Sequence, residues 1–151
     1  MSGAVDDDPD DVAAAQDALM RFVRHFGLHQ ADRTPCGQPL PISEAYAMAE
    51  ISRDGRLRQV DLGRRLRLEK STVSRLVGNL VTRGWVHRHA AGDDGRGVLL
   101  ELTDAGANAA AAQAAARRAR LTTLLARVPD DQRDAVVSAL RTLAEAADDP
   151  H

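Results

Sequence analysis

The chain has 151 residues, which suits one domain or a small module with appendages. Hydrophobic residues make up 44% but aromatic residues only 3%, so we expect an alanine-rich aliphatic core that dimerisation would help to stabilise. No apolar run reaches the roughly 18 residues of a membrane helix, and the acidic start is unlike a signal peptide. The single Cys36 excludes an internal disulfide framework. We therefore expect a soluble cytoplasmic protein with no membrane partner.

The net charge of −2 conceals a strong segregation of charge along the chain. Between Arg53 and Arg96 there are eleven basic and five acidic residues, a balance of +6, and the remainder carries −8. Such asymmetry suggests that the basic segment meets a polyanion. A merely solvated basic surface is the alternative.

Two regions precede this basic segment. Residues 1–11 are acidic and contain proline and glycine, and we expect them to be disordered. From Val12 to Phe26 apolar residues recur every three or four positions, which predicts an amphipathic helix. A proline-rich stretch then extends to residue 41. Residues 12–41 are therefore interpreted as an N-terminal dimerisation helix and its linker.

Three short helices are expected next. The first starts near Ser43, the second spans residues 59–67, and the third is "EKSTVSRLVGNLVTRG" at residues 69–84. In the third helix Val73, Leu76, Val77 and Leu80 form a stripe for burial. Two short helices joined by a tight turn, the second with a polar outer face, are typical of a helix-turn-helix.

After Gly84 the spacing of apolar residues changes from that of a helix to that of short strands. The strand candidates "WVHRHA" and "GVLLELT" flank the turn-rich "AGDDGRG" and predict a β-hairpin wing. Thr103 is a plausible N-cap for a helix of about twenty-five residues, and Pro129 opens a last helix. We expect a mainly α (α+β) fold, with a winged helix-turn-helix at residues 42–103 and C-terminal dimerisation helices at residues 104–151.

The outer helices carry apolar stripes that so short a chain leaves without a covering layer. An intertwined homodimer would cover them, and we favour this arrangement. Packing of the same stripes on the chain's own winged helix is the alternative.

The candidate recognition helix has a polar face that contains no acid between residues 70 and 84. Small hydroxyl and amide side chains reach phosphates and base edges, and an arginine can contact guanine bidentately. An ordinary solvated helix face is the alternative, although such faces usually carry glutamate. The predicted DNA-binding residues of this helix are Lys70, Ser71, Thr72, Ser74, Arg75 and Asn79.

The wing offers a second set of candidates. Arg96 is near the hairpin tip with Asp94 two residues before it, and an arginine there suits a narrow minor groove. A surface ion pair at a turn is the alternative. Arg88 on the first strand and Lys70 at the helix start are expected to contact phosphates.

The motifs "KSTVSRLV", "RGWV", "DGR" and "LTDAG" together resemble the MarR (multiple antibiotic resistance regulator) family of winged-helix transcription factors, closely over residues 40–106. The resemblance implies a homodimer on a pseudo-palindromic operator, controlled by a small aromatic or phenolic effector, an oxidant or a metal. Ser71, Thr72, Ser74 and Arg75 match recognition-helix positions, and Asp94 and Arg96 match the wing. Arg67 replaces a common turn glycine, and Glu69 replaces a better N-cap.

Effector and metal sites are less clear from the residues. Phe22, Phe26, Tyr46 and Met48 are candidates for an effector pocket, with ordinary core packing as the alternative. His25 and His29 are four residues apart, and Cys36 or Glu44 would complete a zinc site, but such histidines are more often surface residues. We therefore predict no metal and no cofactor.

Taken together, these features predict a sequence-specific, double-stranded DNA-binding regulator, ligand-responsive, homodimeric and repressing. A winged-helix protein-interaction module that binds no DNA is the alternative. No nucleophile–base pair or Gly-rich phosphate loop occurs in the winged-helix segment, so we do not expect an enzyme.

Overall fold

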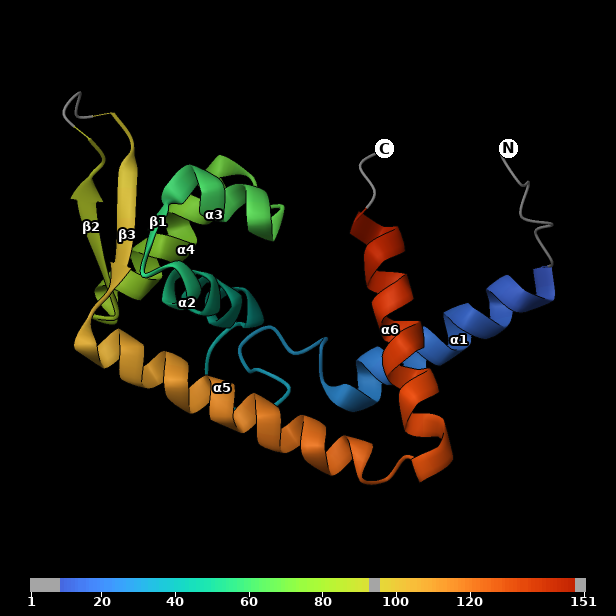
Figure 1. Ribbon diagram of the computed structural model, residues 1–151. Helices are drawn as coiled ribbons and strands as arrows, with labels where there is room; N and C mark the ends of the chain where they lie inside the picture. The colour runs from blue at the N-terminus through green and yellow to red at the C-terminus, as the bar shows by residue number, and fades with distance from the viewer. Residues whose placement is uncertain (1–8, 93–95, 149–151) are drawn as a thin grey trace. The chain divides into compact units, whose positions relative to one another are not determined.

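The computed structural model describes residues 9–92 and 96–148, which are mostly helical with one small sheet (Figure 1). The chain divides into two compact units after Ala116. Within the described residues, no helix has the length and apolar character needed to cross a membrane. The elements in order are α1 (Pro9–Phe26), α2 (Ile42–Asp54), β1 (Arg56–Arg58), α3 (Gln59–Leu66), α4 (Lys70–Thr82), β2 (Val86–Ala90), β3 (Val98–Leu102), α5 (Asp104–Leu125), the 3₁₀ turn η1 (Asp130–Gln132) and α6 (Arg133–Asp148).

Helices α3 and α4 form the expected helix-turn-helix. The α3 helix ends at Leu66, and the left-handed backbone of its C-cap residue Arg67 (φ 53°) turns the chain toward α4. The N–H groups of Arg67 and Leu68 close the helix on carbonyl oxygens of α3. At the start of α4, Glu69 makes no side-chain capping hydrogen bond. The turn therefore keeps its geometry with an arginine where glycine would be less strained.

The sheet has three antiparallel strands in the order β1-β3-β2, one more than the sequence predicted. Leu57 of β1 is opposite Leu100 of β3, and both are buried. The flanking Arg56 and Arg58 are exposed. A strand of three residues is too short for an alternating pattern to stand out, and its only mark is one leucine between two arginines.

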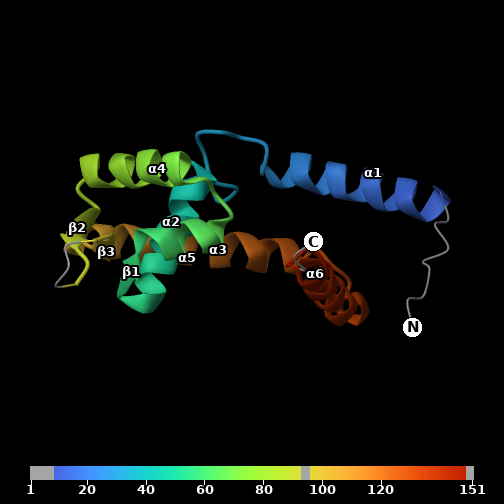
Figure 2. The same cartoon turned by 90° about the horizontal axis from the view of Figure 1, so that it is seen from above.

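The core of the winged helix is closed by α2, α3, α4 and the sheet, which Figures 1 and 2 show gathered together. The predicted stripe of α4 faces this core, and its four apolar residues are all buried. Gly63 of α3 allows close packing, because a Cβ there would be 3.3 Å from Cγ2 of Val73. The largest fully buried side chains are Met48, Ile51, Leu62, Leu80, Leu100 and Val77.

The first turn of α5 is joined to the winged helix by two specific contacts. Thr103 caps α5 as expected: its hydroxyl accepts from the N–H of Gly106 at 2.9 Å and donates to the carbonyl oxygen of Gly84 at 2.7 Å. A Cβ on Gly106 would be only 2.0 Å from the carbonyl oxygen of Trp85. The glycine of "LTDAG" is therefore required by a backbone-to-backbone approach.

Helix α1 begins at Pro9, so the expectation of disorder through residue 11 is wrong for residues 9–11. Asp10 and Asp11 are in its first turn, where negative charge interacts favourably with the positive end of the helix dipole. Residues 1–8 lie outside the described residues.

Apolar side chains remain exposed on the outer helices. Leu19 and Met20 of α1 are each 58% exposed, and Leu140 and Leu143 of α6 are 54% and 64% exposed. None of the described residues of α6 is buried. The amphipathic stripes that the sequence predicted are therefore present as apolar surface.

Candidate nucleic-acid interface

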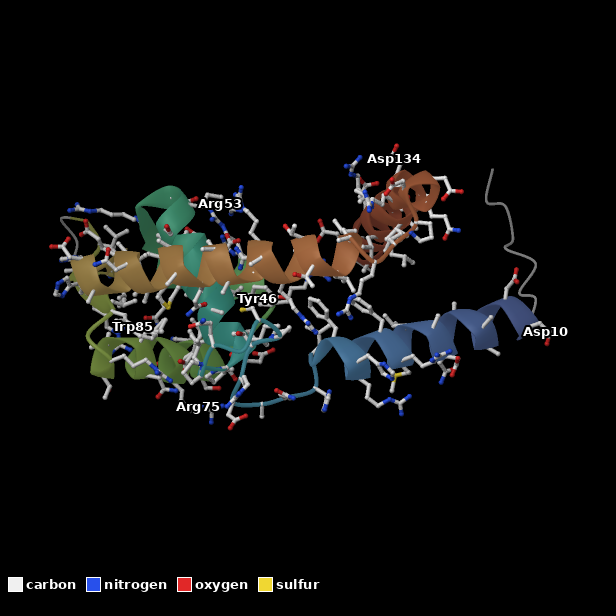
Figure 3. The ribbon with its side chains drawn as sticks, turned by 90° about the horizontal axis from the view of Figure 1, so that it is seen from below. Asp10, Tyr46, Arg53, Arg75, Trp85 and Asp134 are labelled. Carbon is white, nitrogen blue, oxygen red and sulfur yellow. The ribbon has the colours of Figure 1, made fainter. Side chains whose placement is uncertain are left out.

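Helix α4 presents the polar face that the sequence predicted. Lys70, Ser71, Ser74 and Arg75 are exposed, and Thr72 is half-buried. Arg75 extends from α4 at the edge of the winged helix (Figure 3). Because the opposite stripe of the helix is buried in the core, these side chains can turn only outward.

The basic side chains of this region fall into two groups, those that are ion-paired with carboxylates and those that are not. Arg65 donates to Asp54 at 2.6 Å and to Glu50 at 3.0 Å, which fixes α3 against α2. The hydrogen bond from Arg65, with a further contribution from Arg53, holds the pKa of the Asp54 carboxyl below its usual value. The same interaction with Asp54, followed by that with Glu50, raises the pKa of Arg65. These cations already have acidic partners.

Lys70 and Arg75 belong to the second group. Within residues 9–92 and 96–148, neither has a carboxylate at ion-pairing distance. A cation without an ion pair inside the protein can pair with an external anion without first breaking an internal ion pair. The first half of α4 is therefore the part of this face best suited to a phosphate or a base edge.

Asn79 has a partner that the sequence did not suggest. It is exposed, but its Nδ2 donates to Oε1 of Glu44 on α2 at 3.1 Å. Glu44 itself is only 3% exposed. That Asn79 contacts DNA remains a prediction, but part of its hydrogen-bonding capacity is already used within the protein.

The three predicted DNA-binding residues of the wing differ in their surroundings. Arg88 of β2 donates from Nη2 to the carbonyl oxygen of Ser74 at 3.2 Å, so its guanidinium lies against α4. Arg96 is exposed just before β3. Asp94 lies outside the described residues. Of the three predicted wing contacts, Arg88 therefore links the wing to the recognition helix, which no spacing pattern in the sequence indicated.

A groove of about 620 Å³ borders the first turn of α4, and sequence reasoning did not find it. Its apolar lining includes Val60, Val73 and Val98. Arg64 and Lys70 contribute polar groups at its edge. The N-terminal end of α4 is therefore bordered by both apolar and cationic surface.

The predicted effector residues do not all face one pocket. Met48 is fully buried in the core, so the core-packing alternative is correct for it. Tyr46 of the same helix is 47% exposed (Figure 3). Phe22 and Phe26 stack on each other within α1, with ring centroids 5.1 Å apart. Met48 cannot line a surface pocket, because its side chain is enclosed on all sides.

The zinc alternative gains no support from the described residues. Among them, no group of three or more histidine, cysteine or acidic side chains is placed to hold a metal ion. The side chains of Cys36 and Thr34 are hydrogen-bonded to each other at 3.0 Å. Glu44 faces Asn79 instead of a histidine.

Comparison with known proteins identifies this architecture. A model described as the MarR family matches residues 38–97, the segment that contains the helix-turn-helix and most of the wing. An uncharacterized HTH-type transcriptional regulator of Mycobacterium bovis is 29% identical over 122 residues, which covers 81% of this chain and 82% of that protein.

Solved structures share the fold over nearly the whole chain. The crystal structure of a probable transcriptional regulator from Pseudomonas aeruginosa is 26% identical, with a TM-score of 0.66, and covers 93% of this chain and 99% of that one. The Staphylococcus aureus MepR–DNA complex has a TM-score of 0.70 at 20% identity, with 87% and 97% of the two chains covered. The family model falls on the segment that folds as a winged helix-turn-helix, and these relatives are described as transcriptional regulators, so this segment is similar to the MarR family of regulators.

Proposed function

We propose that this chain is a sequence-specific, double-stranded DNA-binding transcriptional regulator that acts as a homodimer. The observation that carries the proposal is the acid-free, exposed face of α4, on which Lys70 and Arg75 have no acidic partner among the described residues. A MarR-fold relative, MepR, has been solved in complex with DNA. The same docking would place α4 of this chain in a major groove.

Each exposed residue of α4 then has a role set by its chemistry. Arg75 donates to O6 and N7 of a guanine, since a guanidinium fits that edge bidentately. Ser71, Thr72 and Ser74 hydrogen-bond to base edges or phosphates at short range. Lys70 contacts the phosphate backbone at the start of the helix.

The wing contributes minor-groove contact. Arg96, exposed beside β3, enters the narrow groove next to the major-groove site, where the negative potential is strongest. Asp94, matched to the wing motif by resemblance, orients that guanidinium. The balance of +6 between Arg53 and Arg96 supplies the general attraction to DNA.

A second copy of the chain covers the apolar stripes of the outer helices. Exposed leucines at the spacing seen on α6 are typical of a helix that packs against another helix. A two-fold dimer then brings its two α4 helices to half-sites about 34–36 Å apart on a pseudo-palindromic operator. Repression follows if the occupied operator overlaps a promoter.

Ligand control is proposed from the family resemblance. A small aromatic or phenolic compound that favours a dimer geometry with mismatched half-site spacing would release the DNA. A thermal-shift screen of phenolic acids, followed by DNA-binding assays with each compound that raises Tm, tests this directly. Compounds that stabilise the protein without weakening DNA binding would contradict ligand-controlled release.

The decisive experiment is selection of random duplexes by the purified chain, followed by anisotropy titrations of the selected site. Arg75→Ala should relax the preference at one base pair in each half-site, and Arg96→Ala should weaken binding without unfolding the protein. Arg53→Ala is a matched control, since it removes an exposed arginine of α2 that is paired with Glu50 and Asp54.

The competing interpretation, a protein-interaction module, predicts no duplex affinity and a partner whose binding hardly depends on salt. DNA binding through phosphate contacts instead makes the logarithm of the affinity fall linearly with the logarithm of the salt concentration. Selection that enriches no sequence, together with no salt-dependent duplex binding, would refute the proposed function.

A further inference from the structure

A buried carboxylate lies beside the recognition helix and is held by Asn79 of that helix and by Arg83, which follows it. Glu44 of α2 is 3% exposed, and its Oε1 accepts the hydrogen bond from Asn79 at 3.1 Å. Arg83 follows α4 directly, and its Nε is 3.2 Å from Oε2 of the same carboxylate, close enough for an ion pair. The Nε–H of Arg83 does not point at Oε2 well enough for a hydrogen bond. Removing a carboxylate from water is costly unless it is paired, so this cluster constrains its members.

The cluster continues into the start of the wing. The guanidinium carbon of Arg83 is 5.1 Å from the centre of the Trp85 ring, within the range of a cation–π contact. The N–H of Trp85 donates to the carbonyl oxygen of Leu80, and its carbonyl oxygen accepts from the N–H of Thr103. Glu44 is therefore connected to the end of α4 and to the strand that follows.

The other flank of α4 is held by the wing. The 3.2 Å hydrogen bond from Arg88 to the carbonyl oxygen of Ser74 passes beside Gly78, where a Cβ would be 3.8 Å from Nη2 of Arg88. The helix is thus fixed on one side by α2 through Asn79 and on the other side by β2. Both contacts involve residues within one turn of the exposed Arg75 or directly beside it.

We propose that Glu44 and Asn79 are positioning residues that set the rotation of α4 about its axis, and that Asn79 does not itself read a base. A carboxylate can only accept, so it forces the Asn79 amide to turn an N–H toward α2. Asn79 follows Arg75 by four residues, one turn along the same side of the helix. Fixing Asn79 therefore fixes the direction in which Arg75 and Ser71 approach the bases.

This inference rests on the proposed DNA-binding function and adds the source of its specificity. Bidentate readout of a base edge needs an accurate approach of the side chain, whereas phosphate contacts tolerate small rotations. Loss of the Glu44–Asn79 bond should therefore lower discrimination between operator and random duplex and leave non-specific affinity unchanged. Discrimination is expected to fall about tenfold, roughly the loss of one good base contact.

The test is a double-variant cycle on the full chain with two duplexes of equal length, the selected operator and a scrambled sequence. Glu44→Leu removes both carboxylate oxygens at similar volume and so removes the acceptor, and Asn79→Ala removes the donor at an exposed position where folding is least at risk. Both variants should lose about the same factor in the ratio of the two affinities. The double variant should lose no more than either single variant, because all three break the same bond.

A reversed pair supplies the rescue. Asn79→Asp alone sets two carboxylates, both acceptors, against each other and should lower discrimination. Adding Glu44→Gln restores one hydrogen bond with donor and acceptor exchanged, so part of the discrimination lost by Asn79→Asp should return. All affinities are measured below the Tm of the least stable variant, so that a purely structural role would lower Tm without changing the ratio of affinities.

Three results would overturn the inference, and they are distinguishable. If Asn79→Ala changes the preference at a single base pair while Glu44→Leu changes nothing, Asn79 is a base reader. If neither variant changes the ratio, the cluster serves stability alone. If the unaltered chain binds neither duplex, the proposed function itself fails, and the positioning role fails with it.

Discussion

In the winged helix-turn-helix, Met48, Ile51 and Leu62 are completely buried, whereas Leu140 and Leu143 of α6 expose more than half of their surface. The two regions have similar aliphatic content but different surroundings. Between α2 and β3 the chain supplies three helices and a sheet that enclose one another's apolar faces. The helices outside this segment have apolar stripes and no comparable burial among the described residues.

The difference indicates that the winged helix can close its own core, and that the outer helices are shaped for contact with something else. Burying a leucine is worth about 1.5–3 kcal/mol, so a row of exposed leucines is a substantial unused source of stability. In the proposed homodimer, a second copy of the chain would cover these leucines.

Replacing the α6 leucines should dissociate the proposed dimer. The double variant Leu140→Asp, Leu143→Asp places four charges in a two-fold interface, and the dimer Kd should rise at least about a thousandfold. Light scattering should then give the mass of one chain, 16.2 kDa. Val60→Asp is a matched control, since Val60 of α3 is 58% exposed but belongs to the winged helix, and its variant should keep the mass of the unaltered protein. If the α6 variant also keeps that mass, the outer stripe is not the interface.

Gly106→Ala should disconnect α5 from the winged helix. Its Cβ would be 2.0 Å from the carbonyl oxygen of Trp85, and neither backbone can move without breaking the Thr103 cap. Overpacking of this kind costs about 3 kcal/mol. Urea unfolding at fixed protein concentration should show a lower midpoint. A midpoint equal to that of the unaltered protein would mean that α5 is not seated on Trp85.

Gly78→Ala should stabilise the protein, whereas Gly106→Ala should destabilise it. Its nearest neighbour, Nη2 of Arg88, would be in ordinary contact at 3.8 Å, and alanine is favoured over glycine inside a helix by about 1 kcal/mol. The urea midpoint should rise. Destabilisation by this substitution would show that α4 needs a close approach at Gly78, as α5 does at Gly106.

Asp54→Asn should have the smallest effect, and one that depends on pH. Because the hydrogen bond from Arg65 lowers the pKa of Asp54 in the folded state, its contribution is present at neutral pH and is lost as pH falls through that lowered pKa. The variant should melt slightly below the unaltered protein at pH 7, and the two curves should converge below about pH 4. A difference that persists in strong acid would have another cause. With Arg65→Met already present, most of the pH-dependent difference should disappear.

Much of the fold could be predicted from the sequence because periodicity is local. The stripe of α4, the wing strands, the Thr103 cap and the α6 stripe all follow from residues within one or two turns of one another. The strand β1 could not be predicted, because three residues carry no period. The start of α1 at Pro9 could not be predicted from the acidic composition of residues 1–11, which also contain proline and glycine.

The candidate DNA-binding site also has features that local spacing predicts and features that it does not. Which residues of α4 are exposed follows from helical spacing, and the exposed positions of Lys70, Ser71, Ser74 and Arg75 were predicted. Which of the polar residues already have partners does not follow from spacing. For Met48 too, helical spacing is compatible with either a pocket or the core, and only the packing shows that its side chain lies in the core.

The helices of the winged segment, the buried stripe of α4 and the family resemblance all follow from short-range spacing along the chain. The hydrogen bond from Asn79 to Glu44, 35 positions earlier in the chain, and the one from Arg88 of the wing to the backbone of Ser74 emerge only when the chain is folded. The physical reason is that a hydrogen bond depends on where two groups meet in space. That meeting point is set by the packing of α2, α4 and the sheet around a common core.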